Sequence, residues 1–108
     1  LAGLSANETV IIERSEEEAR VHEGANVTSN NWQAAGWRGH SRGPDSAGRA
    51  RQMHEVPTDL DPRFPWLTWP VLNHNTRLAM VSDARSGRLV AQGYECKAPA
   101  TEPLTLAG

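Results

Sequence analysis

The chain has 108 residues with 11 basic and 13 acidic side chains, which gives a formal net charge of −2. This balance excludes strong electrostatic binding of nucleic acid or of an anionic membrane, because both need a clustered excess of basic residues. The single cysteine excludes an internal disulfide framework and a cysteine-rich zinc site. No apolar run has the length of a membrane span or the pattern of a signal peptide, so the cytoplasm is the favoured compartment.

Length and apolar content indicate a small domain with a thin core. Hydrophobic residues make up 38% of the chain, and four tryptophans accompany one phenylalanine and one tyrosine. A domain of this size buries little more than about 60% of its extended surface, so the apolar area is concentrated in a few rings. We therefore predict one partial domain over residues 1–108 that completes its core with residues from elsewhere.

The first predicted element is a β-hairpin. Residues 8–14 form a β-branched run bounded by polar side chains, which is typical of a strand. Residues 15–18, one serine and three glutamates, predict a solvated turn because like charges repel one another. Residues 19–23 then return as the second strand, and the hairpin closes at Gly24.

A short helix is predicted within residues 44–56. Asp45 or Ser46 can cap its start, and Pro57 prevents its continuation. Gly48 weakens such a helix by about 1 kcal/mol relative to alanine.

The segment after the helix, residues 57–70, contains four prolines and two tryptophans and predicts a connecting loop. Its rings, Phe64, Trp66 and Trp69, either cover a core, which we favour, or shape an apolar substrate pocket.

The clearest pattern is a second hairpin. Residues 76–83 and 88–95 are rich in apolar residues, and Gly87 supplies the positive φ that the turn between them requires. Because apolar residues fall on both faces, the pattern predicts a sheet covered on both sides. Residues 97–108 are rich in proline, alanine and threonine and predict an irregular tail.

The titratable residues do not form a metal or nucleophile motif. The four histidines have no zinc-site spacing, so we expect surface or loop positions, no metal and no cofactor. Cys96 has no readable base beside it, which favours an inert thiol over a nucleophile.

Two polar patches contain residues that could take part in catalysis or binding. A side-chain amide at Asn30, or at Asn31 if the register differs by one, could donate to a developing oxyanion. The alternative is a pair of ordinary turn residues.

Arg49, near the start of the predicted helix, could present a fixed positive charge to a carboxylate, a thiolate or a substrate. The alternative there is a solvated arginine behind a capping residue.

Four short motifs follow one another along residues 8–98. They are the Val-Ile-Ile-Glu strand with its Ala-Arg-Val-His-Glu-Gly return, the Val-Thr-Ser-Asn-Asn-Trp segment ending at Trp32, the Asp45-Ser-Ala-Gly-Arg49 helix start, and the Pro70-Val-Leu-Asn-His-Asn-Thr76 entry to the last hairpin. In order and spacing they resemble the C-terminal portion of N-terminal-nucleophile (Ntn) amidohydrolases, the group of choloylglycine hydrolases, acid ceramidases and isopenicillin-type acyltransferases.

The resemblance implies an α+β fold, part of a four-layer αββα sandwich, with two antiparallel hairpins and one short helix in this chain. It also implies hydrolysis of a linear non-peptide C–N amide, or transfer of its acyl group, by an N-terminal cysteine. Asn30 would match the oxyanion donor of the family, with Asn31 as the fallback, and Arg49 would match its helix arginine. Trp66 and Trp69 are the weaker pocket candidates.

One departure from the family concerns the nucleophile. No cysteine precedes the first hairpin, so the attacking thiol has no matching position. The resemblance therefore implies two partners: a small N-acyl amide substrate, and an upstream part of the same protein or a second subunit that carries the thiol. The isolated chain is expected to be inactive.

A second hypothesis is a non-catalytic β-rich interaction module, and a third is a fragment with no independent function. In the module, the tryptophans form one exposed patch for a partner, and Asn30 and Arg49 face bulk solvent. In the enzyme, Asn30 and Arg49 share a polar site at a sheet edge.

Overall fold

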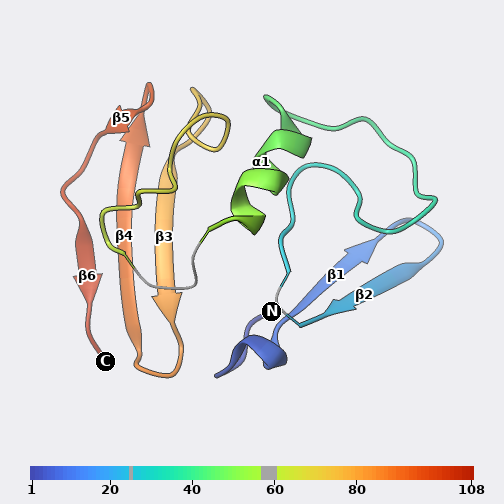
Figure 1. Cartoon of the computed structure of the whole chain (residues 1–108), viewed down its shortest axis with the longest axis horizontal. Helices are drawn as coiled ribbons and strands as arrows, with labels where there is room; N and C mark the ends of the chain where they lie inside the picture. The colour runs from blue at the N-terminus through green and yellow to red at the C-terminus, as the bar shows by residue number, and fades with distance from the viewer. Residues whose placement is uncertain (25, 57–60) are drawn as a thin grey trace.

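The computed structural model describes residues 1–24, 26–56 and 61–108. The fold is α+β, with two antiparallel sheets and one short helix (Figure 1). The elements in chain order are the 3₁₀ turn η1 (Ala6–Glu8), β1 (Val10–Arg14), β2 (Ala19–Glu23), α1 (Ser46–His54), β3 (Leu78–Asp83), β4 (Arg88–Glu95), β5 (Ala98–Pro99) and β6 (Leu104–Leu106).

Strands β1 and β2 form the predicted first hairpin, with Ile12 opposite Val21 in its register. Ser15 closes the turn, because its N–H donates to the Glu18 carbonyl at 2.9 Å and its hydroxyl accepts from the Glu17 and Glu18 N–H groups. The three glutamates of the turn are exposed, as expected for a solvated tip.

Helix α1 confirms the predicted short helix and its cap. The Asp45 carboxylate accepts a hydrogen bond from the Gly48 N–H at 2.9 Å, which satisfies one of the free donors of the first turn. A Cβ at position 48 would overlap that carboxylate, so the glycine that weakens the helix also makes room for its cap.

The second sheet is built around β4. Strand β3 pairs with it on one side, with Val81 opposite Val90, and the short strands β5 and β6 pair with it on the other side. The prediction of an irregular tail over residues 97–108 is therefore wrong in part. Leu104–Leu106 has too few residues to be recognised as a strand from sequence, and the open edge of β4 provides its hydrogen bonds.

The core lies on one face of this sheet. The loop that carries Phe64 and Leu67 covers Ala79, Val90 and Tyr94, and Val90 is the most deeply buried side chain. The prediction that this loop covers a core is confirmed for Phe64, which is 3% exposed, and wrong for Trp69, which is 62% exposed.

The opposite face of the same sheet is open among the described residues. Its register aligns Met80 with Ala91 and then with Leu104, so side chains of three strands share this face. Four large apolar side chains on it are at least half exposed: Leu78, Met80, Leu104 and Leu106. The prediction of a sheet covered on both sides is therefore wrong for the described part of the chain, because its segments cover only the face that holds Val90.

Helix α1 lies between the two sheets in Figure 1. The two sheets share no strand pairing, and the described residues do not stack one sheet on the other. Polar contacts connect the parts instead: the Gln52 amide of α1 donates to the Trp66 carbonyl and to the Thr68 hydroxyl, both at 2.7 Å. Over the described ranges, no helix is both long and apolar enough to cross a membrane.

Candidate functional site

A cavity of about 600 Å³ runs along β3 and brings three predicted site residues together. Asn30 reaches it from the loop after β2, Arg49 from α1 and Trp66 from the proline-containing loop. Trp69, the other pocket candidate, does not line this cavity and is largely exposed. The remaining lining residues are Arg42, Gly43, Pro44, Leu67, Val71, Asn73, Asn75, Thr76, Arg77, Leu78, Ala79 and Met80.

The guanidinium group of Arg49 is held in place by backbone atoms. One of its terminal nitrogens donates to the Arg42 carbonyl at 2.8 Å, and the group lies against Gly43. The Nε atom of Arg49 is buried and has no hydrogen-bond partner among the described residues. No carboxylate of those residues forms an ion pair with Arg49, so its positive charge remains available at the cavity.

Asn30 and Asn31 have different surroundings, which bears on the register alternative. Asn30 is exposed and lines the cavity beside Arg49, and its carbonyl accepts from the Arg42 N–H at 3.1 Å. Within the described ranges no residue hydrogen-bonds to its side-chain amide. Asn30 and Arg49 are thus both connected to the backbone of Arg42.

Asn31 belongs to a hydroxyl network instead. Its side-chain oxygen accepts from Ser46 at 2.7 Å and from Ser29 at 2.8 Å, and Ser46 is the buried first residue of α1. This network joins the loop after β2 to the helix start. Asn31 lines a second cavity of about 520 Å³, next to β1, and does not line the cavity that holds Arg49.

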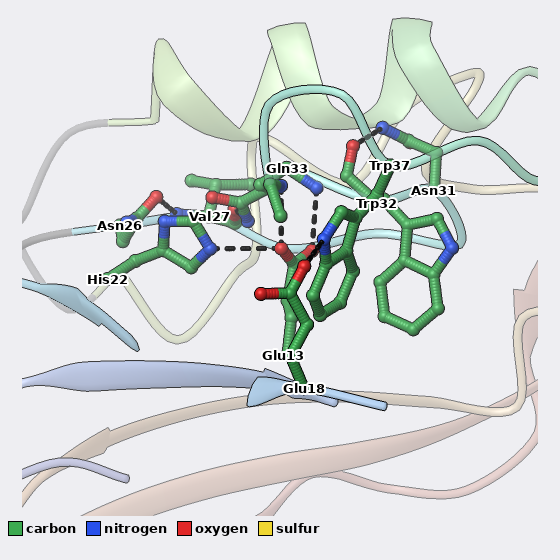
Figure 2. A network of polar contacts seen from close by, with 10 residues as sticks. Glu13, Glu18, His22, Asn26, Val27, Asn31, Trp32, Gln33 and Trp37 are labelled. Carbon is green, nitrogen blue, oxygen red and sulfur yellow. Dashed lines mark hydrogen bonds and ion pairs between the residues drawn. The ribbon is translucent and has the colours of Figure 1, made fainter. Parts of the chain in front are cut away.

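Glu13 of β1 is the polar residue of the site region that the sequence did not reveal. Its carboxylate is 6% exposed and accepts from the Gln33 N–H at 2.6 Å, from the Ala34 N–H at 2.7 Å and from His22 at 2.9 Å. Figure 2 shows this carboxylate between His22 and the loop that carries Gln33. Because Gln33 and Ala34 follow Asn30 closely, Glu13 fixes the Asn30 loop on the first hairpin.

These contacts determine the charge state of Glu13. Burial raises the pKa of its carboxyl group, but the hydrogen bonds from Gln33, His22 and Ala34 and the charge of His22 lower it by more. The net pKa lies below the ordinary value of 4.5, so the carboxylate is ionised at neutral pH.

Asn73 organises the entry to β3 at the far side of the cavity. It is 3% exposed, its amide donates to the Pro70 carbonyl at 3.0 Å, and its side-chain oxygen accepts from the Asn75 N–H at 2.9 Å. The Thr76 hydroxyl accepts from the Asn73 N–H and donates to the Val71 carbonyl. The Pro-Val-Leu-Asn-His-Asn-Thr motif is thus a hydrogen-bonded turn.

The tryptophans do not form one patch. Trp32 and Trp37 meet edge to face at 4.9 Å, and Trp37 donates to Glu18 at 2.7 Å. Trp66 packs edge to face on Phe64 at 5.9 Å, beside the core. The rings therefore lie in separate groups, unlike the single patch expected of an interaction module.

Over the described ranges, the histidines and the cysteine do not gather into a metal or nucleophile site. His22 pairs with Glu13 in the first hairpin and is half-buried, whereas His40, His54 and His74 are exposed. Cys96 is exposed and lines neither the cavity of Arg49 nor that of Asn31. No group of three potential metal-ligating residues occurs in the part of the chain that the structure describes.

Comparison with known proteins finds no matching family model, no matching curated protein and no matching solved structure.

Proposed function

We propose that the chain is part of a cysteine amidohydrolase of the Ntn type, which cleaves a linear non-peptide C–N amide or transfers its acyl group. The observation that carries the proposal is that Asn30, Arg49 and Trp66, which are far apart in the sequence, line one cavity beside the edge strand β3. Trp66 and Leu67 give the lining an apolar part that is suited to an acyl chain, and about 600 Å³ is a usual volume for a small-molecule site.

In this mechanism a thiol attacks the amide carbonyl and forms a tetrahedral intermediate. The intermediate expels the amine and leaves an acyl-enzyme, which water or an acceptor amine then attacks. We place the thiol outside these 108 residues, because Cys96 is exposed and does not line the cavity. The αββα architecture proposed for the complete enzyme likewise includes segments besides the two sheets of this chain.

Asn30 and Arg49 have separate roles in the proposed reaction. The side-chain NH₂ of Asn30 donates to the oxyanion of the intermediate, a contact worth about 3–4 kcal/mol in comparable sites. Arg49, held by the Arg42 carbonyl, supplies a positive charge to polar groups of the site through charge-assisted hydrogen bonds. Asn30 is preferred over Asn31 because only Asn30 lines the cavity of Arg49, although both line the second cavity, and because the oxygen of Asn31 is held by two serines.

The test expresses the chain within its natural reading frame, so that any flanking segment is present, and measures amine release from an N-acyl aminocoumarin. We expect hydrolysis that iodoacetamide abolishes and that Asn30→Ala lowers about 100- to 1,000-fold in kcat. Asn31→Ala tests the register, and Arg51→Ala is the matched control for Arg49→Ala, because Arg51 lies exposed on the same helix. Wild-type rates from both Asn30→Ala and Arg49→Ala would exclude the proposed roles.

A further inference from the structure

Among the described residues, the charges that line the Arg49 cavity all have one sign. They are three arginines, Arg42, Arg49 and Arg77, with no aspartate or glutamate of the described ranges beside them. The other polar side chains of the lining are neutral amides and one hydroxyl. Because the chain as a whole carries a formal charge of −2, this cavity is a local positive region on an acidic protein.

Within the described part of the chain, no side chain neutralises these arginines. Arg49 and Arg77 donate hydrogen bonds to main-chain carbonyls, those of Arg42, His74 and Thr76. The three ion pairs of the described residues involve other basic residues, namely Arg20, His22 and Arg63. Main-chain carbonyls leave a guanidinium with its full charge and with unused donors, and a carboxylate matches such a donor pair in shape.

The lining also contains apolar residues. Trp66, Leu67 and Val71 belong to the loop that covers the core, and Leu78 and Met80 belong to β3. A ligand that satisfies both kinds of lining residue carries an anionic group and an apolar chain.

We propose that the Arg49 cavity binds a carboxylate attached to an apolar chain, with the carboxylate at the arginines and the chain along Trp66 and β3. This inference deepens the proposed function, because it names the class of molecule held at the same cavity, yet binding itself requires no catalysis. Two sources share this chemistry. One is an N-acyl amino acid, whose carboxylate belongs to the amine part, and the other is the free fatty acid that amide hydrolysis releases.

The test measures binding to the purified protein expressed within its natural reading frame, by isothermal titration calorimetry, with decanoate, N-decanoylglycine and neutral decanamide as probes. We expect at least one carboxylate to bind, and decanamide to bind at least about tenfold more weakly, since a charge-assisted hydrogen bond is lost. Tighter binding of N-decanoylglycine assigns the site to the substrate, and tighter binding of decanoate assigns it to the released acid.

Variants distinguish loss of the binding site from loss of the folded structure. Arg49→Gln and Arg77→Gln should each weaken carboxylate binding about tenfold and leave decanamide binding unchanged, whereas Arg51→Gln should change neither. Because Arg77 is exposed, its variant tests the charge even if Arg49→Gln is destabilised. Equal affinity for decanoate and decanamide, wild-type affinity in both variants, or no binding of either carboxylate would overturn the inference. Carboxylate binding without any hydrolysis in the reading-frame assay would support it and contradict the proposed enzyme.

Discussion

A glutamate that faces inward from a two-stranded hairpin loses water on folding, and its partners must offset that loss. Glu13 obtains two backbone N–H donors and His22 in exchange. The sequence predicted the strand but not its orientation, because the apolar residues before Glu13 are consecutive, so Ile11 and Ile12 fall on opposite faces. In the structure, Ile12 is the exposed one at 54%. The position of the Asn30 loop determines which face of the hairpin is buried. The contact between this loop and Glu13 cannot be predicted from the local sequence of the strand.

Replacing Glu13 by glutamine tests this arrangement. Glutamine keeps one acceptor oxygen but places an NH₂ group against a backbone N–H, so a buried donor is left unsatisfied. We expect the free energy of unfolding to fall by about 1–3 kcal/mol in urea titrations. Glu16→Gln, at the exposed tip of the same hairpin, is the matched control and should stay within about 0.5 kcal/mol of the wild type. Equal losses in the two variants would contradict the role of Glu13.

The same residue predicts an acid dependence of stability. The pKa of Glu13 is lowered in the folded state, so its contribution to stability is complete above the ordinary pKa of 4.5 and is lost as the pH falls through the folded pKa. Unfolding measured between about pH 3 and pH 7 should show a smaller loss at low pH in Glu13→Gln than in the wild type. Comparing the two proteins removes the effects of Glu18, Asp61 and Asp83, whose pKa values are also lowered. Parallel curves would show that Glu13 has no such role.

At the scale of elements, strands and helix ends followed from local chemistry. The strand prediction 88–95 matches β4, the prediction 76–83 contains β3, and the Asp45 cap is present. Local sequence does not predict a strand whose hydrogen bonds come from a distant segment. Strand β6 is such a strand, because it forms by pairing with the free edge of β4. The residues of the cavity were predicted only in part. Asn30 and Arg49 were candidates because of their side-chain chemistry, whereas Arg42 and Arg77 were recognised only because the structure places them in the same lining.

Helix α1 provides a prediction that runs against helix propensity. Alanine at an interior helix position is usually better than glycine by about 1 kcal/mol, but a Cβ at position 48 displaces the Asp45 cap, which is worth a similar amount. We expect Gly48→Ala to leave the unfolding free energy nearly unchanged in the wild type. In an Asp45→Ala background the same change should stabilise by about 1 kcal/mol. A full gain in both backgrounds, measured by urea unfolding, would show that the cap does not depend on the glycine.

At the scale of the whole molecule, apolar burial is concentrated in one of the two sheets. The buried cluster around Val90 includes Phe64 and Tyr94, whereas the first hairpin buries a carboxylate and exposes Ile12 and Val21. The two sheets are connected through α1 by hydrogen bonds such as those of Ser46 and Gln52, with no shared apolar core among the described residues. Such an arrangement favours local opening of each part over one cooperative transition.

Native-state hydrogen exchange on Val90→Ala tests this division. Removing two methyl groups from the most buried side chain should cost about 2 kcal/mol, so protection of the β3 and β4 amides should fall about 30-fold. The amides of β1 and β2 should keep their wild-type protection, because no contact with Val90 supports them. Glu13→Gln should produce the opposite result, with lower protection in β1 and β2 and little change in β4. An equal fall in both sheets in either variant would mean that the chain opens as one cooperative unit, and the polar bridge through α1 would then couple the two sheets as strongly as a shared core.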